Sequence, residues 1–228
     1  MGLKKRFAEL NSEVTVCRKC PRLVDWREQV ASTKKRAYRD WDYWGKPVPG
    51  FGDQHARVLV IGLAPGAHGA NRTGRMFTGD SSGNFLFSAL HKAGFANQSQ
   101  SVRNDDGLEL HDLYISAVCR CAPPQNKLLP SEILNCRPYL LTELNLLSTI
   151  QVIVPLGQLA FHQTILLYRE LGYNLPPFNF RHAALYKIGP ELPWLLAAYH
   201  PSQQNTQTGR LTVEMFDEIW RKAVSLLT

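Results

Sequence analysis

The sequence has 228 residues, of which 44% are apolar, which is enough for one large or two small domains with an ordinary buried core. No apolar stretch reaches the roughly 20 residues that span a bilayer, and the N-terminal segment MGLKKRFAEL lacks the apolar run of a secretory signal. We therefore expect a cytoplasmic protein without a membrane segment, and its net charge of +7 suits either a polyanionic partner or a basic protein with no nucleic-acid role.

The N-terminal quarter of the chain differs in pattern from the rest. Residues 1–12 place Phe7 and Leu10 on one face of a predicted short helix, whereas residues 13–56 show no regular apolar period. This irregular stretch carries a C-x2-C motif and the basic run STKKRAYR. We therefore expect an N-terminal extension over residues 1–56.

Regular alternation of strands and helices begins at the segment RVLVIG. This segment is a continuous apolar run, which is typical of a parallel strand buried on both faces. Further along, Ser131 is predicted to cap a helix that breaks near Pro138. In chain order, the pattern predicts strands at 57–62, 112–119, 151–157 and 194–200, and helices at 81–94, 130–147, 158–171 and 212–227.

This alternation predicts an α/β protein. Strands separated by helices form parallel βαβ units, so we expect a three-layer α/β/α fold around a sheet of about four parallel strands. The core of this fold would occupy residues 57–228. Together with the cysteine-bearing extension it would form a single domain over residues 1–228.

Three polar segments follow predicted strands. They are GLAPGAHGANRTGRMFTGD at 62–80, CRCAPPQNK at 119–127 and HPSQQNTQTGR at 200–210. Ligands of open parallel sheets bind outside the carboxyl ends of the strands, so we expect the three segments to converge on one site. The first segment is rich in glycine but matches neither the G-x-G-x-x-G nor the Walker pattern of phosphate-binding loops.

Five cysteines, an odd number, argue against a disulfide framework. Cys17 and Cys20 form the C-x2-C motif, and a strand–helix unit can bring Cys121 and Cys136 together. Four thiolates suit either tetrahedral zinc or a [4Fe–4S] cluster, and the spacing alone does not separate the two. A third alternative is that these cysteines bind nothing. Cys119 is one thiol too many for a four-ligand site and is expected in the core.

These motifs together resemble the uracil-DNA glycosylase superfamily, most closely its family 5. The resemblance is carried by the three strand-end segments in order, by Cys136 and by the C-x2-C motif, and it spans residues 17 to about 215. It implies that an N-terminal cluster-binding extension helps to hold a structural [4Fe–4S] cluster rather than zinc, with Cys17, Cys20, Cys121 and Cys136 as ligands. It also implies a monomeric DNA glycosylase of base excision repair, associated with the nucleoid if the source is prokaryotic, whose partner is DNA containing uracil or other damaged bases.

The glycosylase reaction indicates what the site residues would do. The target nucleotide is extruded into a pocket, and the base then leaves as an anion while the sugar gains oxocarbenium character. The resemblance implies that Phe77 stacks on the extruded base and that His200 donates a hydrogen bond to the uracil oxygen where charge develops. The backbone at Gly62, Ala64 and Gly66 is expected to lie close to the nucleotide.

Two positions depart from relatives with strong uracil activity. At Leu63–Ala64 those relatives carry Asp, Asn or Glu, which helps to place the attacking water; Asp80 is the expected substitute, unless it only caps the next helix. At Ala117, family 4 carries an asparagine that reads the edge of uracil. A small apolar residue there predicts a roomier pocket that accepts hypoxanthine as well as uracil. Asn126 would supply another amide contact, unless it is only a turn residue.

The remaining polar side chains of these segments are expected at the pocket mouth or on DNA. His68 would face the mouth of the base-binding pocket, and the basic run from Lys34 to Arg39 would contact DNA unless it is only solvated. Each has the alternative of a solvated loop residue. Phosphate contacts are predicted for Ser202, Arg72, Arg75 and Arg210.

Other functions compete with hydrolysis of uracil-containing DNA. No lysine stands in an evident catalytic position, so a lyase step through a Schiff base is not expected. A metal-stabilised module that binds nucleic acid without cleaving it is the alternative, since the usual water-placing side chain is missing. A cysteine nucleophile at Cys119 or Cys121 with His200 as base is disfavoured, because no glycine elbow precedes it and Cys121 is assigned to the metal.

Overall fold

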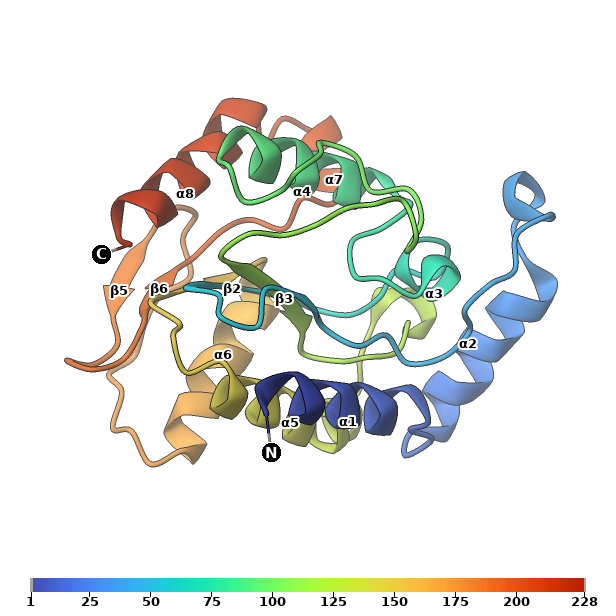
Figure 1. The fold of residues 1–228 in the computed structure, drawn as a ribbon, viewed down its shortest axis with the longest axis horizontal. Coiled ribbons are helices and arrows are strands. Elements are labelled where there is room, and N and C mark those ends of the chain that lie inside the picture. The colour runs from blue at the N-terminus through green and yellow to red at the C-terminus, as the bar shows by residue number, and fades with distance from the viewer. Residues whose placement is uncertain (1, 228) are drawn as a thin grey trace.

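A six-stranded sheet runs through the middle of the protein in the computed structural model, which describes residues 2–227 (Figure 1). The strand order is β1-β3-β2-β4-β6-β5. The inner four strands are parallel, as predicted, whereas both edge strands are antiparallel and were missed because they are only two and three residues long. The strands are β1 (Phe51–Gly52), β2 (Val58–Gly62), β3 (Leu113–Ala117), β4 (Val152–Pro155), β5 (Leu185–Lys187) and β6 (Trp194–Leu196).

Helices cover both faces of the sheet, which gives the predicted three-layer α/β/α architecture (Figure 1). Helices α4 and α8 pack against each other on one face, and α1, α5 and α6 lie on the other. Their bounds are α1 (Leu3–Thr15), α4 (Ser81–Lys92), α5 (Pro130–Leu146), α6 (Gln158–Glu170) and α8 (Val213–Ser225).

The continuous apolar run of β2 is explained by burial on both faces of the sheet. Val58 and Val60 belong to one hydrophobic cluster, and Leu59 and Ile61 belong to the other. All four side chains are fully buried. Alternate residues of a strand point to opposite faces, so only a strand covered by helices on both sides can be apolar throughout.

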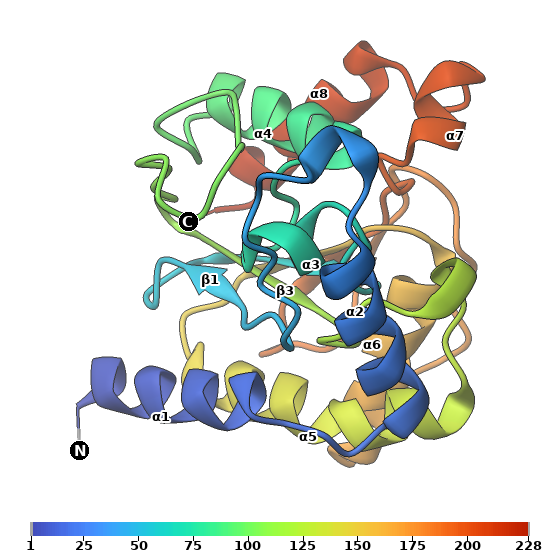
Figure 2. The same cartoon turned by 90° about the vertical axis from the view of Figure 1, so that its right-hand side faces the viewer.

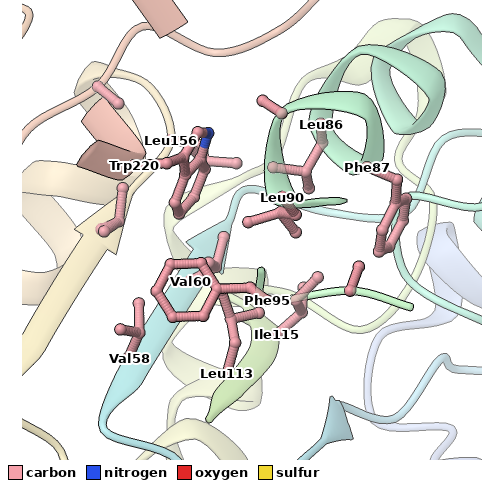
Figure 3. Close-up of a cluster of buried hydrophobic side chains, with 14 of the residues drawn as sticks. Val58, Val60, Leu86, Phe87, Leu90, Phe95, Leu113, Ile115, Leu156 and Trp220 are labelled. Carbon is pink, nitrogen blue, oxygen red and sulfur yellow. The ribbon is translucent and has the colours of Figure 1, made fainter. Parts of the chain in front are cut away.

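The core between the sheet and α4 is built from large interlocking side chains (Figure 3). Leu86 and Leu90 of α4 reach toward the strands, and Trp220 of α8 closes the cluster from the neighbouring helix. Burial of side chains of this size is worth about 1.5–3 kcal/mol each. This packing fixes α4, and thereby the segment that leads into it, relative to the strand ends.

The extension is more regular than its sequence pattern predicts. Helix α1 packs against α5, and a second helix, α2 (Pro21–Thr33), lies beside α3 (Ala70–Thr73) (Figure 2). The expectation of irregular structure over residues 13–56 was wrong for α2. Its buried face includes Arg27, and a charged residue in the apolar stripe hides the helical period.

Helix α5 also differs from its prediction at two points. It runs unbroken through Pro138, which is exposed, so the carbonyl that loses its helical partner can be hydrated. It begins with Pro130 at its first position, and its N-cap is Leu129 rather than Ser131. The backbone N–H of Leu129 donates to Oε2 of Glu132 at 2.7 Å, which satisfies the start of the helix.

Short elements connect the main ones. They are η1 (Arg36–Tyr38), α3, η2 (Pro124–Asn126) and α7 (Gln203–Gln207), and the last two follow β3 and β6. Of the helices in residues 2–227, none combines the length and apolar character needed to cross a bilayer.

Candidate active site and cysteine site

A cavity of about 840 Å³ opens at the carboxyl ends of the parallel strands, which is within the size range of small-molecule sites. It is lined by all three polar strand-end segments, as parallel topology predicts. The predicted site residues that line it are Gly62, Ala64, Gly66, His68, Phe77, Asp80, Ala117, Asn126, His200 and Ser202.

Phe77 forms an aromatic wall of this cavity. Its ring lies against the end of β2, where a Cβ on Gly62 would come within 2.9 Å of the ring, so only glycine leaves it room. Phe77 itself has a φ of +53°, a left-handed conformation that is uncommon for a side-chain-bearing residue. The segment thus holds the ring in a strained position at the strand end, as is typical of functional sites.

His200 lies beside Phe77 in the same cavity. The two ring centroids are 5.9 Å apart, with 33° between the ring planes. Burial lowers the pKa of His200 to about 4, so its imidazole is neutral at pH 7. Asn205 Nδ2 donates to the main-chain oxygen of His200 at 2.8 Å and fixes the backbone there. The result is a neutral imidazole held at a fixed place in the cavity.

Asp80 combines the two roles considered from the sequence. Its Oδ1 accepts from the backbone N–H of Gly83 at 2.9 Å and caps α4. The carboxylate also lies against the glycine loop in the cavity, where a Cβ on Gly69 would come within 2.0 Å of Oδ2. Burial raises the pKa of Asp80, while the amides of Gly83 and Ser82 oppose that shift. A carboxylate with a raised pKa is a better proton acceptor near neutral pH.

The wall of the cavity at the end of β3 is apolar. Ala117 ends β3, is 1% exposed and lines the cavity beside Leu63 and Ala64. Asn126, with a φ of +58°, stands exposed at the rim, and Ser202 caps the short helix α7. The paired hydrogen bonds of an amide side chain are therefore missing from this wall.

His68 also lines the cavity, with a partner that the sequence did not suggest. Tyr43 from the extension places its hydroxyl 3.2 Å from Nδ1 of His68. Burial lowers the pKa of His68, with further lowering from Lys35 and Arg72. Lys35 and Tyr38 of the basic run also line the cavity. The extension thus completes the cavity wall, which the irregular pattern of residues 13–56 did not reveal.

Arg72 and Arg75 do not stand where the sequence placed them. Arg72 is 3% exposed, donates to the carbonyls of His68 and Gly79, and lies 3.9 Å from the ring centroids of both Tyr38 and Trp41. Arg75 is also buried and is paired with Asp106 at 2.8 Å. The assignment of these two residues to DNA phosphates was wrong, because both guanidinium groups hold the loop together. Arg210, in contrast, is exposed, 4.9 Å from the ring of Tyr199.

A second cavity brings the four predicted ligand cysteines together. It is lined by Cys17, Cys20, Cys121 and Cys136, with Arg27, Arg120 and seven other residues. Cys119 is fully buried outside this lining, as expected of a core residue, and its Sγ points to the carbonyl of Glu132 at 3.7 Å. Within residues 2–227, no three Cys, His, Asp or Glu side chains are already gathered around the position of a single ion.

Hydrogen-bond donors point at three of these sulfurs. Arg27 Nη1 lies 2.8 Å from Sγ of Cys121, Asn135 Nδ2 lies 3.5 Å from Sγ of Cys20, and the backbone N–H of Arg120 donates to Sγ of Cys136 at 3.2 Å. Burial raises the pKa of the Cys121 thiol to about 12, and Arg27 opposes this shift. Hydrogen-bond donors around sulfur are common at metal-bound thiolates, whose properties they tune.

Two buried arginines at this cavity are only partly satisfied by the described residues. Nε of Arg27, and Nε and Nη1 of Arg120, have no hydrogen-bond partner among the described residues. Arg120 forms a buried ion pair with Glu143, whereas the carboxylate nearest to Arg27 is Glu28, at 3.8 Å and nearly half exposed. Unpaired buried N–H groups of this kind fit an anionic group bound between the four cysteines.

Comparison with known proteins agrees with the motifs. The model of the uracil DNA glycosylase superfamily matches residues 49–224. Type-5 uracil-DNA glycosylases of Mycobacterium bovis and Thermus thermophilus are both 51% identical to this chain, over 96% and 93% of it and over 81% and 94% of their own lengths. The type-5 enzyme of Pyrobaculum aerophilum is 43% identical over 92% of this chain and 88% of its own length. The resemblance is thereby confirmed, and the chain belongs to the uracil DNA glycosylase superfamily.

Proposed function

We propose that this chain is a monofunctional uracil-DNA glycosylase of base excision repair, which hydrolyses the bond between uracil and deoxyribose in DNA. Its membership of the superfamily and its similarity to type-5 enzymes over most of its length support a DNA glycosylase. The observation that carries the proposal is the cavity in which Phe77 and the neutral His200 stand together at the strand ends.

In this proposal the aromatic wall receives the extruded base. Extrusion costs a few kcal/mol, and stacking on an aromatic ring returns about 1–3 kcal/mol for each base. Phe77 offers its ring in a cavity that is large enough for a nucleotide. Ser202, Arg210 and the basic run from Lys34 to Arg39 lie on the exposed surface or at the cavity and would bind the DNA backbone.

His200 would act on the leaving base. A neutral imidazole keeps one ring N–H, and this group would donate a hydrogen bond to the uracil oxygen. As the glycosidic bond breaks, the negative charge that develops on that oxygen would strengthen this hydrogen bond. Preorganised donors of this kind contribute about 10²–10³ to a rate constant.

Asp80 would accept the proton of the attacking water. Its carboxylate stands in the cavity, and its raised pKa makes it a suitable acceptor. Leu63 and Ala64 supply no such group. The oxocarbenium character of the sugar lowers the demand on this base, so Asp80 adds to a reaction that His200 already promotes.

The apolar wall at Ala117 extends the proposal to other deaminated bases. Without an amide that matches the edge of uracil, the cavity has no paired contact by which to reject hypoxanthine, and it has room for a larger base. Asn126 at the rim would then make the remaining amide contact. We therefore propose that uracil and hypoxanthine are both substrates.

Cys17, Cys20, Cys121 and Cys136 would hold a [4Fe–4S] cluster. The four thiols line one cavity, donors point at three of their sulfurs, and unpaired guanidinium N–H groups suit an anionic cluster. When bound, the cluster would cross-link the extension to the β3–α5 unit and take no part in excision. Iron and sulfide analysis, with the broad visible absorption of such clusters, separates this assignment from zinc.

The experiment that tests the function is the appearance of abasic sites in a duplex with a single uracil. We expect the wild-type protein to release uracil under single-turnover conditions. In His200→Ala the rate constant of uracil release should fall by about 10²–10³. Binding of the duplex without release of uracil would instead identify a non-catalytic module that binds nucleic acid. Sedimentation of the active protein tests the expected monomer.

A further inference from the structure

One buried arginine contacts both the cysteine cavity and the base-binding segment. Arg27 of α2 is 2% exposed. Its Nη1 donates to Sγ of Cys121 at 2.8 Å, and its Nη2 donates to the carbonyl of Cys17 at 3.2 Å. The guanidinium therefore joins a ligand cysteine of the β3–α5 unit to one of the extension.

The main chain of the same residue meets the glycine loop. The carbonyl of Arg27 accepts a hydrogen bond from Nδ2 of Asn71 at 3.2 Å. Asn71 belongs to α3 and is 1% exposed, and its own N–H donates to the carbonyl of Gly66 at 3.0 Å. Gly66 lines the base-binding cavity, and α2 and α3 lie side by side (Figure 2). Hydrogen bonds thus run from a cysteine sulfur to the cavity wall.

Whether the buried charge of Arg27 is compensated depends on what fills the cysteine cavity. Glu28, its nearest carboxylate, is 3.8 Å away and also pairs with the exposed Arg18. A buried guanidinium with an unpaired Nε is costly, and a negative group at Cys121 removes that cost. The contrast is Arg120, which Glu143 neutralises whether or not the cysteines bind a metal.

We propose that Arg27 is a positioning residue that couples the metal site to the base-binding loop. Thiolate ligands at the filled site would hold its guanidinium in place, and its carbonyl would hold Asn71 and, through it, the turn at Gly66. This inference rests on the proposed cluster and on the proposed role of the cavity. Loss of the guanidinium contact should therefore weaken uracil binding at a distance, with little effect on bond breakage.

The test is a double-mutant cycle of Arg27→Gln and Asn71→Ala, with Arg6→Gln as matched control. Arg6 also lies in the extension, on α1, but it is exposed and lines neither cavity. We expect each single variant to raise KM for uracil-containing DNA by about tenfold, with kcat changed much less, and the double variant to show no further rise. Arg6→Gln should leave KM unchanged.

The reduction potential of the cluster provides a second readout. Hydrogen bonds to cysteine sulfur raise the potential, so Arg27→Gln should lower it and Asn71→Ala should not move it. Arg27→Lys keeps the positive charge and should restore part of both effects, which shows that the residue does more than fill space. Circular dichroism verifies that each variant is folded.

Two results would overturn the coupling. One is multiplication of the two KM effects in the double variant, because independent sites behave in that way. The other is a shifted potential in Arg27→Gln with an unchanged KM, because Arg27 would then serve the cluster alone. If the wild-type protein contains zinc instead of iron, the cluster assignment fails, and the KM cycle still decides whether Arg27 and Asn71 act together.

Discussion

The two cavities of this protein treat buried ionisable groups in opposite ways. In the cavity at the strand ends, burial favours neutral forms, since it lowers the pKa of His200 and His68 and raises that of Asp80. In the cysteine cavity, two arginines remain buried with unpaired N–H groups. The histidines and the carboxyl group of the first cavity are shifted toward their neutral forms, whereas in the second cavity Arg27 has only the half-exposed Glu28 as a nearby carboxylate.

This difference follows from what each cavity would hold. In the proposed reaction a neutral base would enter the first cavity, and negative charge would appear there only as the bond breaks, so a neutral donor would distinguish the transition state from the ground state. A cluster with four thiolates would be a permanent anion, so permanent cations suit the second cavity. Variants that remove a charge partner near the second cavity, or change a side chain that lines the first, test this comparison.

The largest effect is expected where permanent charge loses its partner. Glu143→Gln would leave Arg120 buried and uncompensated, and breaking a buried ion pair costs about 3–5 kcal/mol. Urea unfolding measures the loss. Glu170→Gln, which breaks the half-exposed pair with Arg137, should cost less than about 1 kcal/mol. Equal losses of unfolding free energy in both variants would show that the buried pair contributes no more to stability than the half-exposed one.

Removal of the neutral donor should act on rate rather than on folding. His200→Ala is expected to lower the single-turnover rate by about 10²–10³, because the oxygen of the leaving base loses its hydrogen bond. The matched control is His162→Ala, an exposed histidine of α6, which should retain full activity. Full activity of His200→Ala would remove His200 from the mechanism.

The burial of His200 should also appear as a dependence of stability on pH. Its pKa is about 4 in the folded protein and 6.5 when unfolded, so below pH 6.5 the unfolded chain binds more protons. The stabilising contribution is complete above pH 6.5 and is lost as the pH falls to 4, by about 3 kcal/mol. Urea unfolding at several pH values between 7 and 4 measures this loss. The free energy of unfolding should fall less steeply with decreasing pH in His200→Gln than in the wild-type protein. Identical slopes would contradict the burial of this imidazole.

A substitution at Asp80 separates its two roles. Asn caps helices as well as Asp does, so Asp80→Asn should keep the stability of α4 within about 0.5 kcal/mol. The carboxylate is lost, and the rate should fall by about 10² if it accepts the proton of the water. An unchanged rate would leave Asp80 with only its capping role. Asp80→Ala should lose both the rate and about 1 kcal/mol of stability.

The sequence predicts the parallel core well because periodicity reports burial on both faces. The apolar run of β2 indicates a strand buried on both faces, and the apolar face of α8 indicates a helix that packs on the sheet. Parallel strands then place the three polar segments at one edge of the sheet. Helix α2 escaped prediction because Arg27 occupies its buried face. An arginine in a core position is explained only by a partner far away in sequence, here Cys121.

In the candidate site, too, contacts between distant parts of the sequence decide where side chains lie. Motif position indicated Phe77, His200 and Asp80, which all line the cavity. It misplaced Arg72, because Tyr38 and Trp41 of the extension cover its guanidinium. A local motif reveals which residues follow a strand, but tertiary contacts decide which of them reach solvent.

The smallest expected effect concerns the choice between bases. Ala117→Asn would place an amide on the apolar wall and restore a paired contact with the edge of uracil. We expect the preference for uracil over hypoxanthine to rise by about tenfold, since one pocket contact is worth about 1–3 kcal/mol. Single-turnover rates on duplexes with either base measure this ratio. Ala117→Ser is the control for added polarity without the amide and should change the ratio less. If Ala117→Asn left the ratio unchanged, the apolar wall would not be what admits larger bases.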